Sequence, residues 1–229
     1  RRIRLQERII SDANGELEKQ IEEKRLLLRE VHHRIKNDIS FVYSLLSLQA
    51  RESRNAEATI YLTEAAGRVA LIGKVYEQLY STDDFGVVSV RELTGELAAT
   101  LRGATIPPRI SFALESEELI LPVKESVTLS IVLNELVTNA VKYAFVASDD
   151  PVLSAAVRRG AKGELLLTVR DNGRGIPDHI VQGEQYGLGY TIISALVAQH
   201  GGNLAVRNEN GGVVEISFPW RIGAPTGSA

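Results

Sequence analysis

A heptad pattern in the first fifty residues constrains this chain more than any other feature. Apolar residues recur in two series, which are Ile21, Leu28, Ile35 and Val42, and Ile10, Leu17, Val31 and Leu45. Such a repeat is typical of a helix that packs on partner helices. With Leu28 and Val31 on the seam, His32 flanks the seam. His33 then lies opposite it, so we expect His33 to be the most exposed residue of its turn.

The helical face around His33 suggests reactivity. Glu30 lies three residues before His33 and Asn37 four residues after it, so the three side chains share one face. An exposed imidazole beside a carboxylate and an amide suits a nucleophile, with Glu30 able to hold or deprotonate the ring. On this evidence alone, an ordinary surface histidine is the alternative.

Composition limits the class of protein. The 229 residues, 44% hydrophobic and 24% charged, describe a soluble globular chain of one large or two ordinary domains. The net charge of -3 argues against a nucleic-acid binder. The lack of cysteine excludes disulfides and thiol catalysis and fits a reducing, cytoplasmic compartment.

No apolar run is long enough to span a membrane. The chain begins at Arg1 without methionine, so we expect a fragment whose upstream sensor domain or membrane attachment is missing.

The first part of the chain predicts a helical connector and a helical hairpin. Residues 1–25 are charged, and polar residues interrupt their seam, as in a signalling connector. Residues 26–82 contain a first core helix to about Arg51, a polar break, and a second apolar pattern from Leu62 to Leu79. Two amphipathic helices joined by a short loop form a hairpin with an apolar stripe. Two chains can bury both stripes in a four-helix bundle, so we expect a homodimer.

Residues 83–221 predict an α/β layer sandwich with an antiparallel-type sheet, after a linker over residues 81–86. We expect helices over 90–101, 122–145 and 190–200 and strands over 110–114, 152–158, 165–169, 203–208 and 213–218. The last two strands form a hairpin around Asn210-Gly211-Gly212. Residues 222–229 carry no pattern and are predicted to be a disordered tail.

The helix over 122–145 carries a compact polar set at helical spacing, made of Glu135, Asn139, Lys142 and Tyr143. An asparagine carboxamide oxygen can ligate Mg²⁺, which prefers oxygen ligands. A lysine one turn further on can meet a phosphate. A solvated face without function is the alternative.

Two glycine motifs follow. Asp171-Asn172-Gly173-Arg174-Gly175 comes directly after an apolar strand. A carboxylate there can accept from an exocyclic amine, while Gly173 and Gly175 let the backbone pass close to a flat ring. A simple strand-ending turn is the alternative. Tyr186-Gly187-Leu188-Gly189 opens the last helix, where backbone amides form an anion site for phosphate. Helix capping is the alternative there.

In their order and spacing, these motifs resemble the ATP-binding domain of sensor histidine kinases, which is shared with gyrase and the Hsp90 chaperones. The segment Asn134 to Ala144 is similar to the N box, Asp171 to Gly175 to the first glycine box, and Gly187 to Gly189 to the second. Residues 30–37 are similar to the phosphoacceptor box of HWE-like and closely related kinases. The resemblance covers about residues 26–219. A Trp-x-Glu near the second glycine box is missing, which favours the related, non-HWE side of this branch.

The resemblance implies a histidine kinase that uses ATP and Mg²⁺. His33 then accepts the γ-phosphoryl group and passes it to an aspartate on the receiver domain of a response regulator. Asn139 holds Mg²⁺, Lys142 meets phosphate, Tyr143 lies along the nucleotide and Asp171 reads the adenine amine. In this reading, Asn37 orients a water for dephosphorylation of the receiver. The short stretch 176–186 implies a short lid over ATP, and the second glycine box lacks its first glycines.

Two other functions fit parts of the sequence. One is a dimeric phosphotransfer or scaffold protein with a decayed nucleotide domain, which the presence of Asn139 and Asp171 argues against. The other is a hydrolytic ATPase in which Glu135 activates water, which the presence of His33 argues against because such an enzyme needs no phosphoacceptor helix.

Overall fold

The computed structural model describes residues 2–80, 87–145, 150–182, 187–220 and 222–223. The chain divides into two compact units, Arg1–Ser81 and Thr82–Ala229. The predicted domain boundary, between residues 82 and 83, lies in the segment 81–86 outside the described residues, so it stays a prediction. None of the helices in the described ranges combines the length and apolar character that crossing a bilayer requires.

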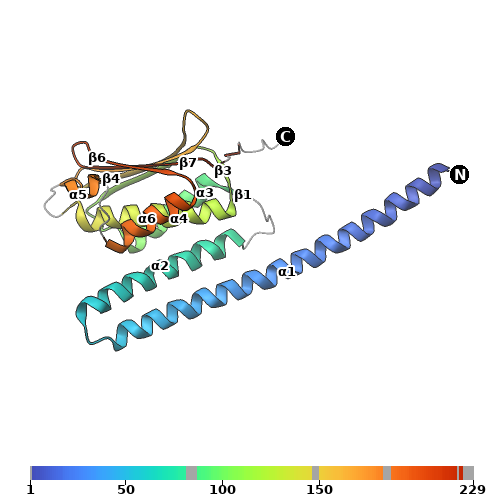
Figure 1. The fold of residues 1–229 in the computed structure, drawn as a ribbon, viewed down its shortest axis with the longest axis horizontal. Coiled ribbons are helices and arrows are strands. Elements are labelled where there is room, and N and C mark those ends of the chain that lie inside the picture. Colours follow the sequence, from blue (N-terminus) through green and yellow to red (C-terminus); the bar gives the residue numbers. More distant parts are fainter. Residues whose placement is uncertain (1, 81–86, 146–149, 183–186, 221, 224–229) are drawn as a thin grey trace. The chain divides into compact units, whose positions relative to one another are not determined.

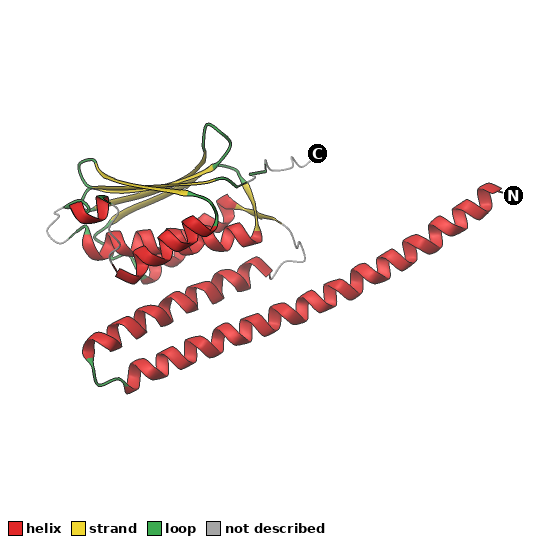
Figure 2. Ribbon diagram, viewed as in Figure 1, coloured by secondary structure: helices red, strands yellow, loops and turns green. Residues whose placement is uncertain are grey.

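The first unit is a helical hairpin of α1 (Arg2–Glu52) and α2 (Ala56–Tyr80) (Figure 2). The connector and the first core helix predicted separately form one continuous helix of 51 residues. Residues 53–55 make the turn. The side-chain oxygen of Asn55 accepts from the backbone N–H groups of Glu57 (2.9 Å) and Ala58 (3.2 Å). This satisfies two of the N–H groups that the start of any helix leaves without a carbonyl partner.

The stripe of α1 that packs in the hairpin differs from the heptad seam. The side chains of α1 that are half-buried or buried include His32, Ile39, Leu46 and Ala50. On α2, a Cβ at Gly73 would lie 3.0 Å from Cγ2 of Ile39, so the two helices approach closely there. Described heptad residues remain 36–55% exposed in the single chain, namely Leu17, Ile21, Leu28, Val31, Ile35, Val42 and Leu45. The hairpin therefore leaves a second apolar stripe on α1 in solvent.

The second unit is built on a five-stranded sheet of order β2-β4-β5-β7-β6 (Figure 1). Its strands are β2 (Ser111–Ser116), β4 (Val152–Arg159), β5 (Leu165–Asp171), β6 (Asn203–Asn208) and β7 (Gly212–Phe218). Three of the four strand pairs are antiparallel, as expected, but β2 and β4 pair in parallel. The chain runs through the long helix α4 (Val123–Tyr143) between them, and a parallel pair requires such a crossover.

Helices α3 (Val90–Ala104), α4 and α6 (Gly187–Gln199) cover one face of this sheet (Figure 1). The strands alternate inward and outward, so their inward side chains meet α4. The buried residues of this interface include Leu153, Val157, Leu165, Leu167, Val132 and Leu133, each 0% exposed. Burying one such side chain contributes about 1.5–3 kcal/mol, so this layer is the core of the unit.

Three short elements were not predicted. Strands β1 (Val87–Ser89) and β3 (Ile120–Pro122) form a two-stranded antiparallel sheet, and α5 (Asp178–Val181) lies in the stretch predicted as a lid. The predicted tail is also partly paired, because Gly223 exchanges backbone hydrogen bonds of 3.1 and 3.2 Å with Ile120. Residues 224–229 lie outside the described part of the chain.

An aromatic cluster closes the end of β7. Trp220 stacks on Phe218 with ring centroids 4.0 Å apart. The indole N–H of Trp220 donates to Nδ1 of His200 (3.3 Å). The other ring nitrogen of His200, Nε2, lies 3.1 Å from Oγ1 of Thr128 on α4. Since Nδ1 accepts from the indole, Nε2 carries the proton and donates to the threonine. The cluster thus joins β7, the end of α6 and α4.

Candidate active site

The polar set of α4 changes from buried to exposed along the helix. Glu135 is 2% exposed, Asn139 is half-buried, and Lys142 and Tyr143 are exposed. A Cβ at Gly189 of α6 would lie 2.7 Å from Oε2 of Glu135 and 3.4 Å from both amide atoms of Asn139. The start of α6 therefore packs against this face. Glu135 is therefore not part of a solvated face, and the structure brings the polar set of α4 and Gly189 together.

Asp171 is the last residue of β5, at the predicted strand end. Its Oδ1 accepts from the backbone N–H of Gly173 (2.8 Å) and from that of Gly212 (3.1 Å). Both of these bonds go to Oδ1, so Oδ2 is the oxygen that can face a ligand. A Cβ at Gly212 would lie 2.5 Å from Oδ2, so only glycine at that position leaves room beside this oxygen. The carboxylate is held in one orientation by charge-assisted bonds.

The glycines of the first box are required by the protein itself. A Cβ at Gly173 would overlap the backbone carbonyl of Ala144, and the N–H of Arg174 donates to that carbonyl (3.0 Å). Gly175 has a φ of 82°, in the left-handed region, and its Cβ would lie 2.9 Å from Oδ1 of Asn208. The sequence-based reason for these glycines was close approach to a flat ring. The structure shows a close approach to the end of α4 and to Asn208.

Two asparagines that sequence reasoning missed hold the same loop. Asn172 accepts from the N–H of Val152 and donates to the carbonyl of Asp150, both at 2.8 Å. Asn208, at the end of β6, accepts from the N–H of Ile176 (2.7 Å) and donates to the carbonyl of the same residue (2.8 Å). Each carboxamide uses both its oxygen and its nitrogen. Asn172 belongs to the Asp171–Gly175 motif and could have been singled out there. The sequence around Asn208 contains no motif that would have indicated its role.

The second glycine box lies inside α6 rather than before it. The helix begins at Gly187, which has a φ of 76°, and not near Tyr190. Gly189 is buried. The first backbone N–H groups of any helix have no intrahelical partner, so this end of α6 is where the sequence predicts contact with phosphate. The side chain of Leu188 and all of Gly183–Tyr186 lie outside the described residues.

On α1, His33 is exposed, as the heptad predicted, and His32 is half-buried against α2. Nδ1 of His32 lies 2.5 Å from the hydroxyl oxygen of Tyr76 on α2, with the ring centroids 5.7 Å apart. Burial of His32, and then the charge of neighbouring His33, lower the pKa of His32 below its ordinary value. His33 is thus the imidazole that faces solvent.

The residues flanking His33 are arranged differently from the expectation. The carboxylate of Glu30 accepts from Nε of Arg34 at 2.9 Å, so its partner in the structure is Arg34 rather than the ring of His33. Asn37 is exposed one turn after His33. Next to it, Lys36 forms an ion pair with Glu77 of α2.

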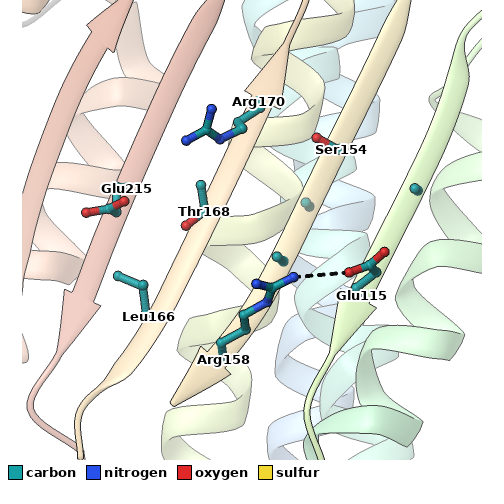
Figure 3. Close-up of a pocket in the computed structure, with 10 residues that line it drawn as sticks. Glu115, Ser154, Arg158, Leu166, Thr168, Arg170 and Glu215 are labelled. Carbon is teal, nitrogen blue, oxygen red and sulfur yellow. Dashed lines mark hydrogen bonds and ion pairs between the residues drawn. The ribbon is translucent and has the colours of Figure 1, made fainter. Parts of the chain in front are cut away.

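A cavity of about 370 Å³ lies elsewhere in the second unit, on the face of the sheet away from its helices (Figure 3). Arg158 donates to Glu115 there at 3.2 Å. The other labelled residues that line it are Ser154, Leu166, Thr168, Arg170 and Glu215 (Figure 3). It contains none of the predicted site residues, so it is separate from the nucleotide site inferred above.

The sheet with its helices, and the site formed by α4, the Asp171 loop and α6, define a class of ATPase domain. Residues 124–222 match the family of histidine kinase-, DNA gyrase B- and HSP90-like ATPases (HATPase_c), which implies ATP as the nucleotide. Residues 30–105 match the HisKA_2 family, described as histidine kinase. The chain belongs to the histidine kinases, in the HisKA_2 branch.

Relatives agree with this assignment. Sensor histidine kinase PdtaS of Mycobacterium tuberculosis is 31% identical over 201 residues, which cover 86% of this chain and 40% of that protein. Blue-light-activated histidine kinase 2 of Erythrobacter litoralis is 26% identical, with 84% of this chain and 56% of that protein covered. The chain thus spans roughly half or less of these relatives. The solved histidine kinase domain of Erythrobacter litoralis EL346 superimposes with a TM-score of 0.61 at 20% identity, covering 79% of this chain and 96% of that one, and shows a shared fold.

Proposed function

We propose that this chain is the core of an ATP-dependent protein-histidine kinase that phosphorylates its own His33. The observation that carries the proposal is the presence, in one chain, of an exposed His33 on a HisKA_2 helix and an oriented Asp171 carboxylate in an ATPase domain. A ring nitrogen of His33, Nδ1 or Nε2, attacks the γ-phosphorus. The bond from that phosphorus to its bridging oxygen breaks, ADP leaves with the electron pair, and the ring releases its proton to solvent.

In this proposal the nucleotide binds between α4, the Asp171 loop and the start of α6. Oδ2 of Asp171 accepts from the adenine amine, because Oδ1 is already engaged by two backbone N–H groups. Lys142, which is exposed, meets phosphate, and Tyr143 lies along the nucleotide. The amides from Gly187 to Gly189 meet the phosphates at the N-terminus of α6.

The residues present fit Mg²⁺ bound together with ATP. The half-buried Asn139 offers an amide oxygen on the face that meets α6. Within the described residues, no group of three or more His, Cys, Asp or Glu side chains is arranged to hold a metal. Mg²⁺ is ordinarily bound by one or two protein oxygens together with phosphates and waters, and this donor set matches that pattern. When bound, the metal neutralises charge on the triphosphate.

We extend the proposal to the partners and the location of the chain. The phosphoryl group passes from His33 to an aspartate of a response-regulator receiver domain in the cytoplasm. Asn37 orients a water that hydrolyses the phosphoaspartate and releases inorganic phosphate. The exposed stripe of α1 pairs with that of a second copy, since a homodimer would remove this apolar surface from water. Glu30 assists His33 in this proposal, and Oε1 of Glu30 accepts from Arg34.

Labelling with ATP tests the proposal. The chain is incubated with Mg²⁺ and ATP labelled at the γ-phosphate, and in parallel with ATP labelled at the α-phosphate. We expect label only from the γ-position, lost in acid and kept in base, as for phosphohistidine. Release of phosphate without labelled protein would instead favour a hydrolytic ATPase. ADP binding without label or phosphate release would favour a phosphotransfer scaffold.

A further inference from the structure

The side chain of Asn208 connects the end of β6 to the loop that follows β5. It lies at the end of β6 and makes two hydrogen bonds to the backbone of Ile176, at 2.7 and 2.8 Å. Ile176 directly follows the glycine segment that begins at Asp171. Because one carboxamide accepts from the N–H and donates to the C=O of the same residue, it holds both peptide groups that flank Ile176.

The turn after β6 also holds the other end of the loop. The N–H of Gly212 donates to Oδ1 of Asp171. Gly211 packs so closely that a Cβ there would overlap the carbonyl of Asp171. The end of the β6–β7 hairpin thus contacts the loop at its first residue, Asp171, and at its last, Ile176.

Between these two anchors the loop contains two glycines, of which Gly175 adopts a φ of 82°. A glycine loses more conformational freedom on ordering than any other residue. A loop that must be ordered when a ligand binds reduces affinity, whereas a loop ordered beforehand does not.

We infer that Asn208 is a positioning residue that orders the Asp171–Ile176 loop before adenine binds. The inference rests on the proposed adenine site. It assigns Asn208 no contact with the nucleotide. Its effect is on the affinity for the adenine end of any nucleotide and not on transfer of the phosphoryl group.

The test compares Asn208→Ala with Asn203→Ala. Asn203 is an exposed asparagine at the opposite end of the same strand, which makes it a matched control. The dissociation constant of ADP is measured by calorimetry. Loss of two hydrogen bonds predicts about five- to thirty-fold weaker binding of ADP to Asn208→Ala, with the control within about two-fold of the parent. The labelling rate at saturating ATP should stay within about two-fold of the parent.

Asn208→Asp and amide hydrogen exchange separate positioning from a general role in folding. The carboxylate of this variant still accepts from the N–H of Ile176 but cannot donate to its carbonyl. We expect slow exchange of the Ile176 amide in the parent and in Asn208→Asp, and fast exchange in Asn208→Ala. ADP affinity should be intermediate in Asn208→Asp.

Three results would overturn the inference while leaving the proposed kinase function in place. They are unchanged ADP affinity in Asn208→Ala, an equal loss of ADP affinity in Asn203→Ala, and a labelling rate of Asn208→Ala at saturating ATP that falls as much as its ADP affinity. Failure of the parent chain itself to bind ADP would overturn the proposed function and this inference together. If Asn208→Ala does not fold, equal ADP affinity in Asn208→Asp and the parent would also overturn the inference.

Discussion

Nδ1 of His32 lies 2.5 Å from the hydroxyl oxygen of Tyr76, which joins α1 to α2 one residue before His33. The pair places one imidazole inside the hairpin and leaves the next one in solvent. Burial lowers the pKa of His32, and the charge of His33 lowers it further. The neutral ring is the form that the Tyr76 hydroxyl can donate to at Nδ1.

The hairpin should therefore lose stability in mild acid. The pKa of His32 in the folded chain lies below the unfolded value of 6.5, so its contribution is complete above pH 6.5 and is lost as the pH falls through the folded value. We expect the melting temperature of the helical signal to fall as the pH is lowered below 6.5. In His32→Gln this dependence should be weaker, and in His33→Gln it should largely remain. Identical pH profiles in the parent and His32→Gln would contradict this.

Substitution of His33 should remove the phosphoacceptor without harming the nucleotide site. His33→Ala should abolish labelling from ATP while ADP binding stays within a few-fold of the parent, because His33 belongs to the helical unit and not to the ATPase domain. His32→Ala should keep substantial labelling. Mapping of the label to His32 would show that the heptad register was assigned wrongly.

Asp171→Asn should weaken ATP binding and relax the preference for ATP over GTP. Because the two backbone N–H groups need an oxygen at the Oδ1 position, the amide should turn its nitrogen toward the ligand, where it can donate to a guanine carbonyl. Loss of a charge-assisted bond of about 1.5–3 kcal/mol corresponds to roughly ten- to a hundred-fold in affinity. Calorimetry with both nucleotides measures it, and Asp178→Asn on α5 is the control. ATP affinity equal to that of the parent would refute the adenine contact.

Asn139→Ala should remove the Mg²⁺ dependence of nucleotide binding and the kinase activity, and leave the domain folded. Asn139 is only half-buried, so truncation should create no core cavity. Calorimetry with ADP, with and without Mg²⁺, should show a gain in affinity from the metal in the parent and in the neighbouring variant Thr138→Ala, but none in Asn139→Ala. Normal labelling in Asn139→Ala would exclude the metal role.

Asn37→Ala should slow dephosphorylation of the receiver more than it slows labelling of His33. Asn37 is exposed one helical turn after His33, and its amide can hold a water but cannot accept a phosphoryl group. Both rates are measured with one cognate receiver domain. Equal losses would make Asn37 a positioning residue for the kinase step, and unchanged rates would leave it without a role in either reaction.

Local patterns were enough to predict most of the fold. The heptad predicted α1 and the exposure of His33, and short apolar runs bounded by turn residues predicted the five strands of the main sheet. Strands β1 and β3 have three residues each, too few for any period to be visible. The parallel pairing of β2 with β4 depends on a partner strand that local sequence does not specify. The heptad likewise marked α1 as amphipathic but did not show which of its stripes α2 covers.

The sequence predicted the residues of the candidate site that face the ligand, but not the residues that hold them in position. Asp171 and Asn139 stand in motifs whose residue types suggest their chemistry. Asn208, however, is 32 residues from its partner Ile176, and only the fold brings the two together. The burial of Glu135 was also missed, because α6 covers Glu135 at Gly189 and only the fold brings these two residues together.

The stacking of Trp220 on Phe218 provides a built-in optical probe. Trp220 is the only tryptophan of the chain and belongs to the second unit, while the hairpin contains no tryptophan. Selective excitation near the red edge of tryptophan absorption should therefore follow the melting of the ATPase domain without contribution from the hairpin. Far-ultraviolet circular dichroism is weighted toward α1, with its 51 helical residues. Recording both signals in one cuvette would resolve whether the two units melt at one temperature or at two.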